Sequence, residues 1–301
     1  MSVGADVKWE EFDAQASGGA APRFAEIWHR LAANPLALIG SFIVLAFILL
    51  GILGPWIAPH SYSDQSLVER LQPPFSKDHL LGTDQLGRDL LSRILEGIRI
   101  SLLVGFVITA ASLLVGAVVG VLAGYYRGKI DAVISGIIDV TWGFPLILIA
   151  VLLVGAFGPG LPAMMAAVGL INWAGFARII RGEVLSLRER EFVQAARALG
   201  ISDLKIMLRH IFPHAIPAAL VLGSYYVALA IIFEAGFSFI GIGAQPPLPS
   251  LGQMIGEGRN YMLASHWVTT VPGVTIALLV IGLNLVGDGL RDVFDPRLKD
   301  R

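Results

Sequence analysis

Several residue types and motifs are scarce in this 301-residue sequence. It contains no cysteine, which excludes disulfide bonds, thiolate nucleophiles and cysteine-ligated metal sites. Only 15% of the residues are charged, whereas soluble proteins carry about 25%. The net charge of −1 and the dispersed basic residues argue against a nucleic-acid partner. Hydrophobic residues, by contrast, make up 55% of the chain, so the composition is that of a membrane protein.

The motif that binds nucleotide phosphates is also missing. The five lysines are followed by Trp, Asp, Ile, Ile and Asp, so no Gly-Lys-Ser/Thr sequence is present. A phosphate-binding loop of the usual kind needs that lysine and hydroxyl. We therefore expect no catalytic residues and no ATP hydrolysis by this chain alone. Any transport that it performs must draw energy from another polypeptide or from a gradient.

Long uncharged runs predict an all-α protein with six transmembrane helices. Each run is long enough to cross about 30 Å of hydrocarbon as a helix. Residues 140–177 are too many for one helix, and the sequence Gly158-Pro159-Gly160-Leu161-Pro162 supplies a turn that divides them. The predicted spans are 36–57, 100–126, 133–157, 161–177, 214–243 and 267–287.

The basic residues set the expected orientation. Sixteen of the 22 lie on the side of the two termini and six on the other side, so the positive-inside rule places both termini in the cytoplasm. Four regions follow: a mobile cytoplasmic tail at 1–22, an N-terminal region with the first span and an extracytoplasmic loop at 23–98, a five-helix core at 99–291, and a cytoplasmic tail at 292–301. The core contains a cytoplasmic loop at about 178–215.

That cytoplasmic loop contains a charged but strongly periodic segment, residues 191–213. Apolar residues recur at helical spacing in each half, which predicts two short amphipathic helices. Gly200 is expected to form the bend between them. Ser202 or Asp203 is expected to be the N-cap of the second helix, and Pro213 is expected to end it. The predicted apolar residues are Phe192, Ala195, Ala196 and Leu199, then Leu204, Met207, Leu208 and Ile211.

The spacing in this segment resembles the EAA loop, a cytoplasmic loop of permease subunits in binding-protein-dependent ABC importers. Ala195, Ala196, Gly200 and Pro213 match the family pattern. Gln194 replaces the family's glutamate, and His210 and Phe212 stand where isoleucine and leucine are expected. The resemblance implies that ATPase subunits contact this loop. The residues expected to take part are Gln194, Ala195, Ala196, Gly200, Ser202, Asp203, Leu204, Leu208 and Pro213.

Three further stretches, 80–102, 234–250 and 287–299, resemble the dipeptide, oligopeptide and nickel branch of these permeases. The resemblance implies a type I ABC importer permease fold in a bacterial inner membrane. The implied partners are a second homologous permease, two cytoplasmic ATP-binding subunits and an extracytoplasmic solute-binding protein. ATP and magnesium would be bound by the ATPase partners, with no cofactor in this chain. The implied cargo is a di- or oligopeptide, with nickel chelates or another small solute as the alternative.

Asp139 and Glu234 are the only acids well inside the predicted spans. Buried carboxylates are costly, so each should face a partner or a wet cavity. They could line a translocation path, couple protons in a gradient-driven transporter, or form hydrogen bonds to neighbouring helices. For the chain as a whole, a structural membrane subunit without a transport path is the other alternative. His210 and His214 are four residues apart, but Pro213 lies between them, and no metal site is expected.

The charge asymmetry predicts a topology that reporter fusions can check. Fusions at Gly128, at Ser202 and after the last residue should all report the cytoplasm, because these positions lie on the basic side of the predicted helices. An external signal from the fusion at Ser202 would contradict both the topology and a contact with cytoplasmic ATPases.

Overall fold

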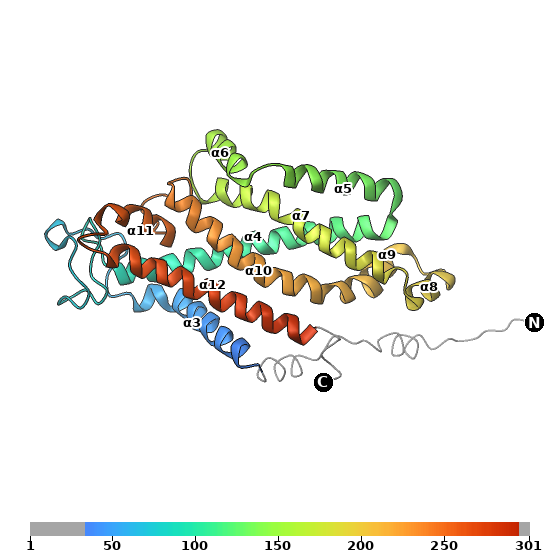
Figure 1. Cartoon of the computed structure of the whole chain (residues 1–301), viewed down its shortest axis with the longest axis horizontal. Helices are drawn as coiled ribbons and strands as arrows, with labels where there is room; N and C mark the ends of the chain where they lie inside the picture. Colours follow the sequence, from blue (N-terminus) through green and yellow to red (C-terminus); the bar gives the residue numbers. More distant parts are fainter. Residues whose placement is uncertain (1–33, 295–301) are drawn as a thin grey trace, which may run out of the picture.

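The computed structural model describes residues 34–294, and these residues form an elongated bundle of helices without a β-strand (Figure 1). Of the predicted tails, 1–22 and 295–301 lie outside the described residues, whereas 292–294 belong to the last helix. The helices are α3 (Pro35–Ile57), α4 (Leu90–Tyr126), α5 (Gly128–Gly143), α6 (Leu146–Phe157), α7 (Leu161–Leu187), α8 (Glu191–Ala198), α9 (Asp203–Lys205), α10 (Phe212–Phe239), α11 (Leu251–Gly258) and α12 (Trp267–Phe294). Short 3₁₀ turns occur at Leu67–Glu69 and Arg259–Tyr261, and Ile206–Ile211 forms a π-helix.

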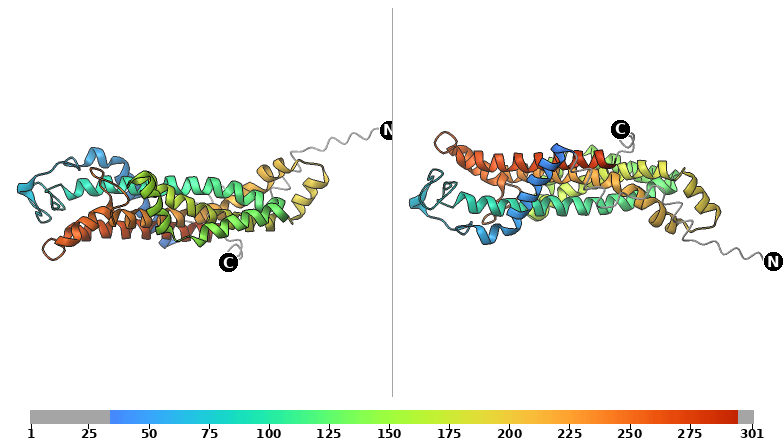
Figure 2. Two further views of the ribbon diagram at one scale, coloured as in Figure 1. Left: turned by 90° about the horizontal axis from the view of Figure 1, so that it is seen from above. Right: turned by 90° about the horizontal axis from the view of Figure 1, so that it is seen from below.

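The two ends of the bundle are built differently. Loop 58–89 and helix α11 cover one end, which we call the α11 end, and α8 and α9 project from the other, which we call the α8 end (Figure 2). Five helices within 34–294 are long and apolar enough to cross a membrane, and the pair α5 and α6 makes a sixth span if it is counted as one. The chain is thus a multi-pass membrane protein.

The third span differs from its prediction as one helix over 133–157. The chain bends by 83° between α5 and α6. The cause is Pro145, because the residue before a proline is pushed out of the helical region. Phe144 accordingly has φ −92° and ψ 128°, and Pro145 itself is the N-cap of α6.

Pro213 does not end the second amphipathic helix, so that prediction was wrong. The chain is helical from Asp203 to Phe239, and Pro213 occupies the first turn of α10. Pro213 has no N–H to donate. It is tolerated there because it directly follows a widened π-turn, in which the Phe212 N–H bonds to the Met207 carbonyl. The π-helix thus joins the short α9 to the long α10 without a break.

Helices α4 and α7 approach very closely along a row of glycines. Gly116, Gly120 and Gly124 are four residues apart on α4, and α7 passes directly over them. A Cβ at Gly120 would lie 2.6 Å from the Ala177 carbonyl oxygen, which no real side chain tolerates. Small residues at this spacing let two membrane helices pack backbone to backbone. The glycine row of α4 thus serves the packing of α7.

This contact gives a stability prediction. We expect Gly120→Ala to lower the midpoint of thermal unfolding in detergent, with overpacking costing about 1–3 kcal/mol. Gly136→Ala is the matched control, because Gly136 lies in α5 and a Cβ placed on it would have no atom within 4 Å. It should be neutral or stabilising, since alanine is the better helix former. An equal midpoint for both variants would contradict the close contact between α4 and α7 at Gly120.

Candidate functional site

The projecting segment at the α8 end, residues 191–211, contains most of the predicted site residues. We call it the coupling segment. Helix α8 ends in a glycine-dependent cap, in which the Gly200 N–H bonds to the Arg197 carbonyl and the Ile201 N–H to the Ala196 carbonyl. Gly200 has φ +75°, so the predicted bend is present. No atom lies within 4 Å of where its Cβ would be, so the backbone conformation, and not crowding, requires glycine there.

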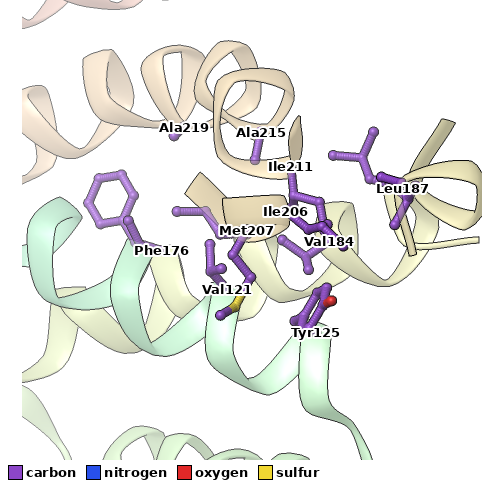
Figure 3. Packing of buried hydrophobic residues seen from close by; sticks show 14 residues of the cluster. Val121, Tyr125, Phe176, Val184, Leu187, Ile206, Met207, Ile211, Ala215 and Ala219 are labelled. Atoms are coloured by element: carbon purple, nitrogen blue, oxygen red, sulfur yellow. The ribbon is translucent and has the colours of Figure 1, made fainter. Parts of the chain in front are cut away.

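One face of the coupling segment is anchored in the bundle. Val193, Ala196, Ile206, Met207 and Ile211 are buried in a hydrophobic cluster with residues of α4, α7 and α10. Figure 3 shows the part of this cluster around Met207 and Ile211, with Val121 and Phe176 among the surrounding residues. The segment therefore packs directly on α4, α7 and α10.

The other face of the coupling segment is exposed and partly apolar. Leu199, Leu204 and Leu208 are 50–63% exposed, although their spacing placed them on the predicted buried faces. Gln194, Ser202 and Pro213 are also exposed, Ala195 is half-buried and Ala196 is buried. The Gln194 amide donates to the Glu189 carbonyl at 3.0 Å. This face is uncovered within the described residues, and Leu204 and Leu208 share a hollow with Val118 and Leu122 of α4.

Tyr125, the second-to-last residue of α4, holds the coupling segment to the bundle. Its hydroxyl donates to Asp203 Oδ1 at 2.5 Å, and the Arg197 guanidinium lies over its ring, 4.8 Å from the centroid. Arg188 donates to the Tyr125 carbonyl. Burial lowers the pKa of Arg188, and the nearby charges of Arg197 and Arg127 act in the same direction. No sequence pattern indicates this role of Tyr125, because the residues that contact it are 63–78 positions away.

The His210 and His214 pair is not arranged as a metal site. His214 Nδ1 donates to the His210 carbonyl at 2.7 Å, and the His214 ring stacks on Phe192 with centroids 5.3 Å apart. His210 is buried. The two rings thus belong to the helical packing at the start of α10.

The two intramembrane acids lie in different surroundings. Asp139 is 70% exposed on α5 and pairs with Arg178 of α7 at 2.5 Å, and the Arg178 guanidinium lies 4.2 Å from the centroid of the Trp142 ring. Within the described residues, this is an ionic pair on an open face of membrane helices. Lipid is a poor environment for such a face, which favours coverage by protein or water.

Glu234 of α10, in contrast, is fully buried. Three serine hydroxyls donate to its carboxylate: Ser101 of α4 at 3.2 Å, Ser238 at 2.8 Å and Ser250 at 2.7 Å. Ser238 Oγ also accepts the Ala244 N–H at 3.1 Å. The carboxylate thus ties α4 and α10 to the chain that enters α11, which matches the expected hydrogen bonding to neighbouring helices.

A buried ionic network stabilises the α11 end. Asp84 Oδ2 accepts hydrogen bonds from Arg88 at 2.6 Å and from Arg93, and all three residues are buried. Glu257 of α11 completes the network, with its carboxylate 2.8 Å from Arg88 and 3.3 Å from Arg93. The stretch around Asp84 stands out in the sequence, whereas Glu257 does not, because it is 164 positions beyond Arg93 and only tertiary packing joins them.

The bundle and its anchored, projecting segment define a polytopic helical membrane protein. Its sequence matches the family model of binding-protein-dependent transport system inner membrane components over residues 116–300. Residues 23–74 match the N-terminal transmembrane domain of oligopeptide transport permease C. The chain belongs to the family of binding-protein-dependent transport system inner membrane components and is a permease subunit of an ABC importer.

Similar proteins agree with this assignment. The dipeptide transport system permease protein DppC of Alkalihalophilus pseudofirmus is 39% identical, over 91% of this chain and 90% of the relative. The glutathione transport system permease protein GsiD of Pectobacterium atrosepticum is 38% identical, with 91% of each chain covered. The inward-facing MetNI methionine ABC transporter has a TM-score of 0.56 at 21% identity, over 67% of this chain and 96% of that one, and so shares its fold.

The surroundings of Glu234 give a prediction about its role. Glu234→Gln keeps an oxygen that accepts hydrogen bonds from the serines, so we expect the midpoint of thermal unfolding to change little. Glu234→Leu leaves the buried hydroxyls without their acceptor and should cost about 2–4 kcal/mol. Unfolding of both purified variants in detergent provides the comparison. Equal stability of Glu234→Leu and wild type would contradict the structural role.

Proposed function

We propose that this chain pairs with a second homologous permease in an ATP-driven importer of di- or oligopeptides. The observation that carries the proposal is the coupling segment, which exposes Leu199, Leu204 and Leu208 while its opposite face is anchored in the bundle. Two cytoplasmic ATPase subunits, which bind ATP and magnesium, would contact the coupling segments of the two permeases. An extracytoplasmic solute-binding protein would deliver cargo at the α11 end. The names of the relatives favour peptides over nickel chelates.

The structure supports a mechanical route from the ATPases to the membrane. Asp203 to Phe239 is one continuous helical run of 37 residues, about 55 Å long, so a push on α9 acts directly on α10. Tyr125 joins the same segment to α4 through Asp203. A displacement at the α8 end thus reaches both helices, and small shifts of packed elements are how such transitions spread.

The open face of α5 and α7 is our candidate for the contact with the second permease or for the translocation path. An exposed Asp139 and Arg178 pair is costly against lipid but suits a polar path between two subunits. Glu234 lies away from any such path, since its carboxylate is enclosed by serines. This arrangement disfavours a gradient-driven transporter that uses the two acids as one relay. In this proposal both termini and the coupling segment face the cytoplasm, because 16 of the 22 basic residues lie on their side.

The bend at Gly200 provides the test. Gly200→Val forces a β-branched residue to a φ of +75° and should misalign the exposed leucines. We expect substrate-stimulated ATP hydrolysis and uptake to fall at least about tenfold, equivalent to 1.4 kcal/mol, in the reconstituted complex. Gly200→Asn should retain most activity, because asparagine tolerates the left-handed region.

Gly158→Val is the matched control for backbone strain. Gly158 has φ +86° and, like Gly200, nothing within 4 Å of its Cβ position, but it lies between α6 and α7. The Gly158→Val variant should insert into the membrane and transport nearly as well as wild type. Wild-type uptake and stimulated hydrolysis in Gly200→Val would show that the coupling segment is not the mechanical contact.

A further inference from the structure

A group of metal-binding side chains lies at the α11 end, apart from the coupling segment and the open face of α5 and α7. His60 follows α3, His79 lies in the loop, and Asp89 is the N-cap of α4. One ligand atom from each of the three falls within 4.8 Å of the others. His79 Nδ1 is 2.9 Å from Asp89 Oδ1, and His60 Nδ1 is 3.8 Å from that same oxygen. The two imidazole rings are 4.8 Å apart.

The surroundings of these three side chains orient them as metal ligands are usually oriented. Asp89 Oδ2 accepts the Ser92 N–H at 2.8 Å and the Ser92 hydroxyl at 2.7 Å, which leaves Oδ1 pointing at the histidines. Ser92 Oγ also accepts the His60 backbone N–H at 3.2 Å, so one serine positions both residues. The other ring nitrogen of His79, Nε2, faces the Glu69 carboxylate at 3.8 Å. A ligating histidine typically turns its second nitrogen to a carboxylate in this way.

The spacing fits a small divalent ion of the borderline class. Zinc binds imidazole nitrogen at about 2.0–2.1 Å and carboxylate oxygen at about 2.0–2.2 Å, so ligand atoms in a tetrahedral site are about 3.3 Å apart. The two distances to Asp89 Oδ1, 2.9 Å and 3.8 Å, lie on either side of that value, and the whole set of ligand atoms spreads to 4.8 Å. The His60 side chain is 37% exposed, which leaves it free to close the difference, whereas His79 and Asp89 are buried and held.

The ion could reach the site and complete its coordination with water. A cavity of about 320 Å³ lies beside the cluster and is lined by His60, Tyr62, Ser92 and Glu96, among others. Three protein ligands and one open position facing such a cavity are the arrangement that zinc adopts with a bound water. Two imidazoles and a carboxylate disfavour Mg²⁺ and Ca²⁺, which prefer all-oxygen sites.

We propose that His60, His79 and Asp89 form a Zn²⁺ site that clamps the end of α3 and loop 58–89 to the start of α4. Zinc replaces the proton between His79 and Asp89 and adds a bond to His60, so it adds to the apolar packing of α3 on α4 and to the hydrogen bonds that already hold the loop. In sequence the three ligands are 10–29 positions apart, without the spacing of a metal motif, so no sequence pattern predicts this site. In the orientation proposed above, the clamp lies on the extracytoplasmic face.

The test is zinc binding by the full-length chain in detergent, purified without a histidine tag. Competition with a chromophoric zinc chelator measures the affinity, and X-ray absorption identifies the ligands. We expect one equivalent to bind with two imidazoles in the first shell, and zinc to raise the midpoint of thermal unfolding. His60→Gln and Asp89→Asn should each weaken binding at least about tenfold and abolish the thermal shift. Asparagine keeps an oxygen for capping α4, which should preserve folding.

His266→Gln is the matched control. His266 is an exposed histidine just before α12, outside the cluster, and its replacement should leave the zinc affinity unchanged. Circular dichroism confirms that each variant is folded. Wild type that binds no zinc, or unchanged affinity in either His60→Gln or Asp89→Asn, would overturn the proposal. The assay needs no transport partner, so its result is independent of the proposed function.

Discussion

The close contact between α4 and α7 is the constraint on which the rest of the bundle depends. The glycines at 116, 120 and 124 let the α7 backbone pass where side chains would otherwise stand. The hydrophobic cluster that holds the coupling segment is built directly on this pair, with Val121 and Tyr125 from α4 and Phe176 and Val184 from α7. If the two helices moved apart, the support for the projecting segment would be lost, since its buried residues pack on both.

Charge is distributed in this protein so that ionised groups are paired, hydrogen-bonded or placed near the helix ends. The Asp84 network lies at the α11 end, and Arg188 and Arg197 surround Tyr125 at the α8 end. Glu234 is deep inside but receives three hydroxyl hydrogen bonds. The Asp139 and Arg178 pair differs from these sites because it is exposed along membrane helices, and it therefore marks a face that another surface should cover.

The continuity of α9, the π-helix and α10 changes how the coupling segment works. A separate short helix ended by Pro213 would be a flexible attachment, whereas the run from Asp203 to Phe239 is one helical stretch, with Pro217 inside it. The π-turn makes this possible because it accommodates Pro213 at the start of α10. Only the bend at Gly200 then separates α8 from this helical stretch. The direction of α8 therefore depends on the positive φ of one residue.

Local sequence determined most of the helices and their membrane character, because apolar length and helical spacing are properties of short segments. The positions of α3 and the bend at Gly200 follow from that level, and so does the glycine row of α4.

Tertiary structure decided what depends on contacts between distant residues: which leucines of the coupling segment stay exposed, the bond between Tyr125 and Asp203, the inclusion of Glu257 in the Asp84 network, and the meeting of His60, His79 and Asp89. Periodicity identifies an apolar face but not the surface that covers it. The bend at Pro145 and the passage of the helix through Pro213 show the same limit, since a proline ends, bends or begins a helix according to the backbone hydrogen bonds available around it.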